Sequence, residues 1–192
     1  MNPKEIILNA FARADKERGL RIIVPDSYLS TGHLKKADHN LIVMTDLNNL
    51  GHEDWVVTAA YYAMYQAATA LLTKIGLHSK EHAATVAVLE HFFGKQLEKE
   101  VIEQFNGIKQ KKDEIEKITV IEEKYIDYIW KAKNARETAQ YGISIAYKET
   151  DNIMANAREF VSKIKLVLEE IDEKLIEILH NTAKELKQGA EK

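Results

Sequence analysis

The chain has 192 residues, a formal net charge of −3 at pH 7 and no cysteine. This length suits one domain that can bury a core, and a hydrophobic fraction of 45% is ordinary for a globular protein. The slightly acidic balance provides no overall attraction to nucleic acid or anionic lipid. An RNA contact would therefore need a local basic patch or a cleft between two subunits.

The absence of cysteine excludes a disulfide framework, a thiolate metal site and a cysteine nucleophile. No apolar run is long enough to cross a membrane, and the N-terminal residues lack the basic and apolar segments of a signal peptide. We therefore expect a cytoplasmic protein without a membrane partner.

Prolines occur only at Pro3 and Pro25, which favours long helices through the rest of the chain and predicts an all-α fold. The first predicted helix covers residues 4–18 and ends at Gly19. Residues 20–24 form the one short run with strand character, which predicts an extended connector. Residues 1–29 are thus expected to form an N-terminal helix and a linker.

The second predicted helix starts near Ser30 or Thr31 and ends at Gly51, with apolar residues at spacings of three or four. The third is capped by Asp54 and runs to Gly76. Its many alanines let neighbouring helices approach closely, which predicts the centre of the bundle.

A fourth helix is predicted from a cap at Ser79 to Gly94, followed by a shorter helix at about 97–105. The segment 109–124 carries many charges of both signs, as is typical of a solvated helix face. Another helix is expected at about 122–141.

The last predicted helix begins near residues 150–151 and continues past Lys184, with one unbroken apolar stripe. It is longer than a compact bundle needs, so its far part should pack on the N-terminal helix or on a second subunit. We expect an up-and-down bundle of five or six helices over residues 30–172 and a helical extension over 173–192.

The segment 54–72 and the residues after it form a distinctive pattern. It comprises Trp55, Ala60-Tyr61-Tyr62-Ala63-Met64-Tyr65, Ala67-Ala68, Leu71-Leu72, Gly76 and the Lys80-x-His82 pair. This pattern resembles the small prokaryotic HEPN domains that are often encoded beside minimal nucleotidyltransferases. The resemblance implies a helical bundle that forms a homodimer and acts with a nucleotidyltransferase-type partner in a toxin–antitoxin or stress-defence role.

Many HEPN domains are RNases with an arginine, four to six further residues, and then a histidine. By this resemblance Arg136 matches the family's arginine and Asn134 the polar residue near it, but Tyr141 stands where the histidine begins to be expected. Histidine, with a pKa of about 6.5, exchanges protons near neutral pH, whereas tyrosine at about 10 does not. Arg136 could still hold a phosphate, so we expect binding rather than enzymatic cleavage.

Structural roles explain several of these residues equally well. The tyrosines of the third helix fit a packed core with satisfied hydroxyls. Arg136 could simply pair with an acid such as Glu137, and a spacing of five residues places Tyr141 about 140° away from Arg136 around a helix.

His82 has three alternative roles. It could cap or hydrogen-bond a helix start, serve as a polar partner of Arg136, or ligate zinc together with His78. The last needs a third converging ligand, so we expect no metal or other cofactor.

Three functional hypotheses remain open. The first is an interaction and binding module. The second is a metal-independent endoribonuclease that uses Arg136 with Tyr141 or His82. The third is a nucleotide- or RNA-binding module without catalysis, whose candidate residues are Arg136, Asn134, Tyr141 and Tyr62.

Overall fold

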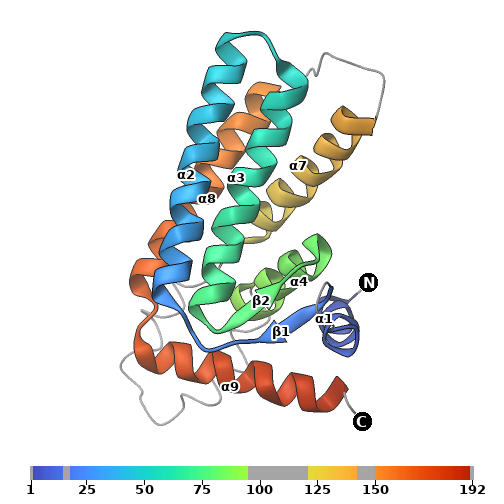
Figure 1. Cartoon of the computed structure of the whole chain (residues 1–192), viewed down its shortest axis with the longest axis vertical. Coiled ribbons are helices and arrows are strands. Elements are labelled where there is room, and N and C mark those ends of the chain that lie inside the picture. Colours follow the sequence, from blue (N-terminus) through green and yellow to red (C-terminus); the bar gives the residue numbers. More distant parts are fainter. Residues whose placement is uncertain (1, 15–17, 95–120, 142–149, 191–192) are drawn as a thin grey trace.

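The computed structural model describes residues 2–14, 18–94, 121–141 and 150–190, which form seven α-helices and a two-stranded β-ribbon (Figure 1). The predicted all-α bundle is therefore confirmed. The helix expected at 97–105 and most of the charged segment 109–124 lie outside the described residues.

Four long helices form the body of the molecule: α2 (Ser27–Asn49), α3 (Glu53–Lys74), α7 (Glu123–Tyr141) and α8 (Thr150–Glu170). Helix α3 packs against the other three and is the centre of the bundle, as predicted. It is apolar around most of its circumference, which is the pattern of a helix buried on all sides. Its alanines are buried, Ala60, Ala63 and Ala67 among them fully so, and they allow this close packing.

Helix α2 begins earlier than predicted. The side chain of Asp26 accepts a hydrogen bond from the backbone N–H of Leu29 at 2.8 Å, so the helix starts at Ser27 and not at residue 30 or 31. Ser30 instead lies buried inside the first turns, where its hydroxyl donates to the carbonyl oxygen of Ala70 on α3 at 2.8 Å.

Two predicted caps are wrong. The residue before α3 is His52, and Asp54 lies in the first turn, where its charge still complements the helix dipole. Ser79 belongs to a strand, and α4 (His82–Phe93) begins three residues later, after Glu81. The Ser79 hydroxyl hydrogen-bonds to the backbone of Glu81, which turns the chain into the helix.

The extended connector predicted at 20–24 contains β1 (Leu20–Ile22), which pairs antiparallel with β2 (Leu77–Ser79). The sequence did not reveal β2, because three residues are too few to show an alternating pattern. The ribbon ties the N-terminal segment to the turn that joins α3 to α4 (Figure 1).

The last predicted helix is two helices, α8 and α9 (Glu173–Ala190). The break lies at Ile171 and Asp172, and the Asp172 side chain accepts from the backbone N–H of Leu175 at 2.8 Å to cap α9. The apolar stripe continues through the break, so periodicity alone did not indicate it.

Helix α9 crosses the lower end of the bundle and packs against α1 (Pro3–Ala12), which is shorter than the predicted residues 4–18 (Figure 1). The far part of the apolar stripe was expected to pack on the N-terminal helix or on a second subunit, and packing on the N-terminal helix is observed. The Nδ1 atom of His180 also lies 3.0 Å from the carbonyl oxygen of Ile75, which fixes α9 to the end of α3. Within the described ranges, no helix has the length and apolar content needed to span a membrane.

Candidate functional site

Helices α3, α4 and α7 bring together one group of polar and aromatic side chains, which we call the Arg136 cluster. Its members are Tyr61 and Tyr65 from α3, His82 from α4 and Arg136 from α7. Tyr61 and Tyr65 are four residues apart, so they share one face of α3. His82 is the first residue of α4 and meets that face directly.

The imidazole of His82 is held by both tyrosines. Its Nδ1 atom hydrogen-bonds to the Tyr61 hydroxyl. The centre of its ring lies 5.5 Å from that of Tyr61 and 4.4 Å from that of Tyr65. These contacts leave the imidazole little freedom to rotate.

The histidine is kept neutral at physiological pH. Burial lowers the pKa of His82 below 6.5, and the positive charges of Arg136 and Lys133 lower it further. Burial also raises the pKa of Tyr61, so its hydroxyl stays protonated and can donate to Nδ1. That arrangement leaves the ring proton of His82 on Nε2.

The guanidinium of Arg136 lies over the Tyr61 ring, with its central carbon 5.3 Å from the ring centre. Its Nη1 donates to the Gln140 side chain at 3.0 Å, and its Nη2 is 3.7 Å from the Glu137 carboxylate. The expected pairing with Glu137 therefore exists but is long. The Nε atom is buried and has no hydrogen-bond partner within the part of the chain that the structure describes.

Glu137 is shared with a second cation. Its carboxylate accepts a hydrogen bond from Lys133 at 2.7 Å, and this bond lowers the pKa of Glu137 most strongly. Two cations thus face one carboxylate beside a neutral histidine. The immediate surroundings of the Arg136 cluster are positive in a chain that is acidic overall, so the group suits an anion.

The structure separates some of the predicted site residues and joins others. Arg136 and His82 lie in one cluster, with only 12% of the Arg136 side chain exposed. Tyr141 is 80% exposed at the end of α7, and Asn134 lies on the exposed side of that helix. Tyr62 is half-buried at the edge of the cluster, its ring centre 5.5 Å from that of Tyr61.

Tyr61 and Lys133 were not among the candidates from the sequence. Tyr61 was interpreted as a core residue, and it is fully buried, but its hydroxyl reaches the polar cluster. The four-residue spacing of Tyr61 and Tyr65 was the only sequence pattern that indicated two tyrosines on one face of α3. Nothing in the sequence indicated that this face of α3 meets His82.

The structure does not support a zinc site at His78 and His82. His78 lies in β2 opposite Arg21, whereas His82 faces Tyr61. Within residues 2–14, 18–94, 121–141 and 150–190, no three potential ligand side chains converge as a metal site requires.

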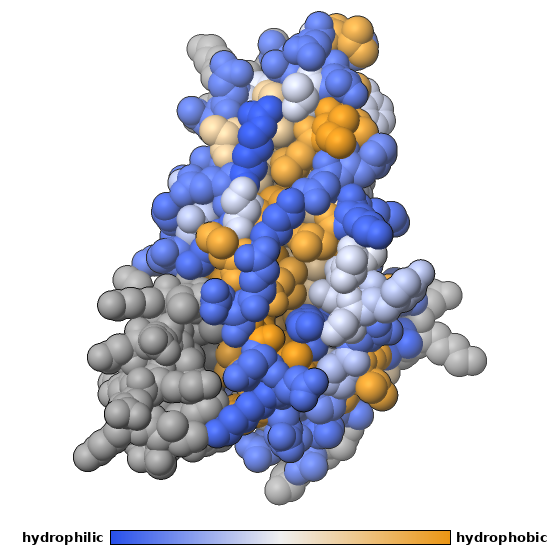
Figure 2. All heavy atoms as spheres, turned by 90° about the vertical axis from the view of Figure 1, so that its left-hand side faces the viewer, coloured by the Kyte–Doolittle hydropathy of each residue, from blue (hydrophilic) through white to orange (hydrophobic). Residues whose placement is uncertain are grey.

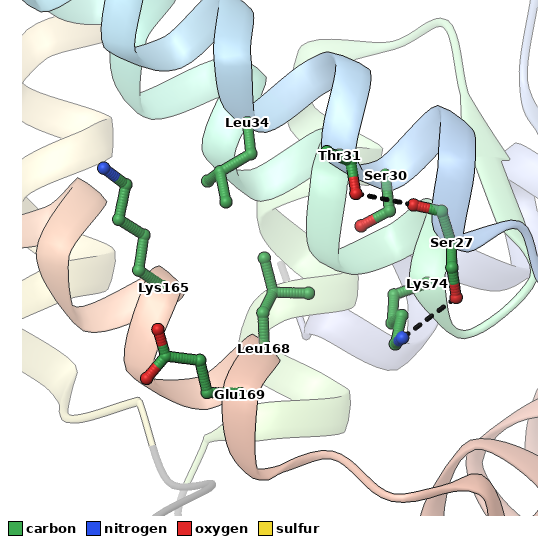
Figure 3. Close-up of a pocket in the computed structure, with 8 residues that line it drawn as sticks. All are labelled: Ser27, Ser30, Thr31, Leu34, Lys74, Lys165, Leu168 and Glu169. Atoms are coloured by element: carbon green, nitrogen blue, oxygen red, sulfur yellow. Dashed lines mark hydrogen bonds between the residues drawn. The ribbon is translucent and has the colours of Figure 1, made fainter.

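A cavity of about 210 Å³ lies elsewhere, between α2, the end of α3 and α8 (Figure 3). Most of its polar side chains already have protein partners, Glu169 being the exception among the interactions described. Lys74 donates to Ser27 at 2.9 Å, the Thr31 hydroxyl donates to the Ser27 carbonyl at 2.8 Å, and Lys165 is paired with Asp38 at 2.6 Å. The cations and hydroxyls that line this cavity are therefore already committed to protein partners, and its remaining polar side chain, Glu169, is exposed to solvent.

A comparison with protein families matches the HEPN domain over residues 31–174. None of the curated proteins matches the chain. The matched region contains α3, α4 and α7, and with them every residue of the Arg136 cluster. Since the match covers most of the 192 residues, the chain belongs to the HEPN family.

Proposed function

We propose that the Arg136 cluster binds a phosphate group of RNA or of a nucleotide, and that the protein is a binding module and not primarily an enzyme. The observation that carries this proposal is the buried Nε of Arg136, which lacks a partner among the described residues. A buried donor without an acceptor costs free energy, and a phosphate oxygen would satisfy it.

The neighbouring groups support the same ligand. The weak 3.7 Å contact with Glu137 leaves the guanidinium incompletely neutralised. Half-buried Tyr62 lies at the edge of the cluster, where an aromatic ring can stack on a nucleobase. Phosphate binding by arginine beside aromatic rings is a common combination in proteins that bind single-stranded RNA.

Fluorescence anisotropy with a labelled single-stranded RNA tests this proposal. The variant Arg136→Gln should bind about tenfold more weakly than the unmodified protein, because a charge-assisted contact is lost. The matched control is Arg158→Gln, since Arg158 is an exposed arginine of α8 that bonds only to Thr45 among the partners described for it. Equal losses in the two variants, or none in either, would count against a site at Arg136.

Metal-independent RNA cleavage is a second candidate, and the neutral His82 beside Arg136 favours it. To act as the base, His82 must carry its ring proton on Nδ1 and donate it to the Tyr61 hydroxyl, so that Nε2 is free to accept the proton of a 2′-hydroxyl while Arg136 stabilises the phosphate. In this candidate mechanism His82, on α4, takes the place of the histidine that the sequence lacks near the end of α7. The catalytic pair is then Arg136 with His82 and not Arg136 with Tyr141.

Cleavage is tested with purified protein and labelled RNA in the presence of a metal chelator. If the candidate holds, His82→Gln abolishes cleavage while His39→Gln, at an exposed position of α2, retains it. Cleavage that survives unchanged in His82→Gln would eliminate this candidate.

The partners proposed are a second copy of the chain and a nucleotidyltransferase-type protein, in a toxin–antitoxin or stress-defence setting. Ile42 on α2 and Leu166 on α8 are 61% and 57% exposed, on helices joined by the pair of Lys165 and Asp38. Apolar side chains are visible between polar ones on the face shown in Figure 2. Such a surface is suited to a subunit contact.

Light scattering tests the dimer. Ile42→Glu together with Leu166→Glu should produce a monomer, whereas Tyr28→Glu, at a residue 91% exposed at the start of α2, should not. A monomeric unmodified protein at micromolar concentration would contradict the proposal. Co-purification with the product of a neighbouring gene tests the second partner.

A further inference from the structure

The two faces of the β-ribbon differ in character. Leu20, Leu77 and Ser79 are buried on the side toward the core. Because side chains alternate along a strand, the directly paired Arg21 and His78 lie together on the opposite face.

Lys80 extends that face by two residues. Its backbone N–H donates to the carbonyl oxygen of Gly19 at 3.1 Å, so the antiparallel pairing continues past the end of β2. At the other end the N–H of Ile23 donates to the carbonyl oxygen of Gly76 at 2.9 Å. The ribbon is therefore held at both ends around the pair of Arg21 and His78.

A histidine from α2, His33, also acts on His78. Burial lowers the pKa of His78 most, followed by the charges of Arg21, Lys80 and His33. His33 is oriented by a contact of 2.7 Å between its Nδ1 and the side-chain oxygen of Gln66. All three neighbours that act on His78 are thus basic residues.

Arg21 has an unmet hydrogen bond. Its Nη2 atom is buried, and none of the described residues accepts from it. The carboxylate of Glu81, the residue that follows Lys80, is committed to Arg13 at 2.9 Å. A buried guanidinium N–H without an acceptor costs free energy, which an anion at this place would recover.

We propose that Arg21 and His78, supported by His33 and Lys80, form a second anion site that takes the phosphate group of a phosphate monoester or of free phosphate. This ribbon site differs from the Arg136 cluster in both residues and elements. Arg21 also precedes residues 31–174, so the match to the HEPN domain does not include it. The ribbon site does not depend on RNA binding at Arg136.

Proton NMR of the histidine rings tests the ribbon site in the full-length protein. The pKa of His78 is measured in sodium phosphate and in sodium chloride of equal ionic strength, and its signal is assigned with His78→Gln. Bound phosphate should raise the pKa of His78, because a negative charge beside the ring favours its protonated form. A parallel arm with adenosine monophosphate shows whether free phosphate or a monoester raises it more.

Arg21→Gln should abolish the phosphate-dependent shift of His78, while Arg136→Gln and Arg158→Gln should leave it intact. Arg21→Gln should also melt at the same or a higher temperature than the unmodified protein in chloride, because the variant removes an unsatisfied buried donor. A His78 pKa that is equal in phosphate, adenosine monophosphate and chloride would overturn the proposal. A phosphate-dependent shift of the His78 pKa that persists in Arg21→Gln would also overturn it. A lower melting temperature of Arg21→Gln in chloride would do the same, because it would show that Arg21 has a purely structural role.

Discussion

The guanidinium carbon of Arg136 lies 5.3 Å from the centre of the Tyr61 ring, which joins the late helix α7 to the central helix α3. The same tyrosine hydrogen-bonds to His82, so one buried side chain positions both the arginine and the histidine. Tyr61 is therefore a positioning residue for the Arg136 cluster.

Removal of the Tyr61 hydroxyl should destabilise the protein. Tyr61→Phe keeps the ring beneath Arg136 but leaves Nδ1 of His82 without its partner, at an expected cost of about 1–3 kcal/mol in the free energy of unfolding. Urea denaturation measures this cost. Tyr28→Phe, at an exposed tyrosine, should change the free energy by no more than about 0.5 kcal/mol.

The stability should depend on pH through His82. Its pKa in the folded protein lies below the unfolded value of about 6.5, so the unfolded state binds more protons and stability falls as the pH drops through about 6.5. His78 contributes in the same direction. Thermal melts between pH 8 and pH 5 should therefore show a weaker pH dependence in His82→Gln, and also in Arg136→Gln, which removes a positive neighbour. An unchanged pH dependence in both variants would show that His82 is not held neutral in this way.

Gly76 should tolerate no side chain. It has a φ of +78°, and a Cβ atom there would lie 2.5 Å from Nδ1 of His180, the residue that fixes α9 to the end of α3. Gly76→Ala should lower the free energy of unfolding by more than Gly51→Ala, because Gly51 has a similar φ of +76° but open space around it. The backbone cost common to both is roughly 1–2 kcal/mol. An equal decrease in the free energy of unfolding in the two variants would show that His180 and α9 can move away from the added Cβ atom without a measurable loss of stability.

The break between α8 and α9 depends on the Asp172 cap. Asp172→Ala should reduce the free energy of unfolding by about 1 kcal/mol, because the N–H of Leu175 loses its acceptor. Asp172→Asn retains an acceptor oxygen and should be close to the unmodified protein. Chemical denaturation of the three proteins distinguishes a cap from a charge effect, since a charge effect would make Asn as harmful as Ala.

The sequence predicted the helical elements better than their limits. The alanines of α3 and the scarcity of proline indicated a central helix, because both are properties of a single segment. The cap at Asp26, the strand β2 and the break at Asp172 were missed, since each depends on one or two residues that a periodic pattern does not weigh.

The candidate site could be predicted residue by residue but not as an assembly. Arg136 and His82 were both candidates, on family resemblance and residue chemistry. Their proximity follows from the packing of α4 and α7 against one face of α3, which no spacing in the sequence encodes. Tyr141 follows Arg136 by five residues, yet it lies in solvent because helical geometry points it elsewhere.

The central claim is that Arg136 and His82 belong to one phosphate-binding site, and the most direct test is the pKa of His82 measured by NMR with and without a short single-stranded RNA. In the free protein the pKa should lie below about 6.5. Saturating RNA should raise it in the unmodified protein but not in Arg136→Gln. A His82 pKa that is the same in free and RNA-saturated protein would contradict the claim.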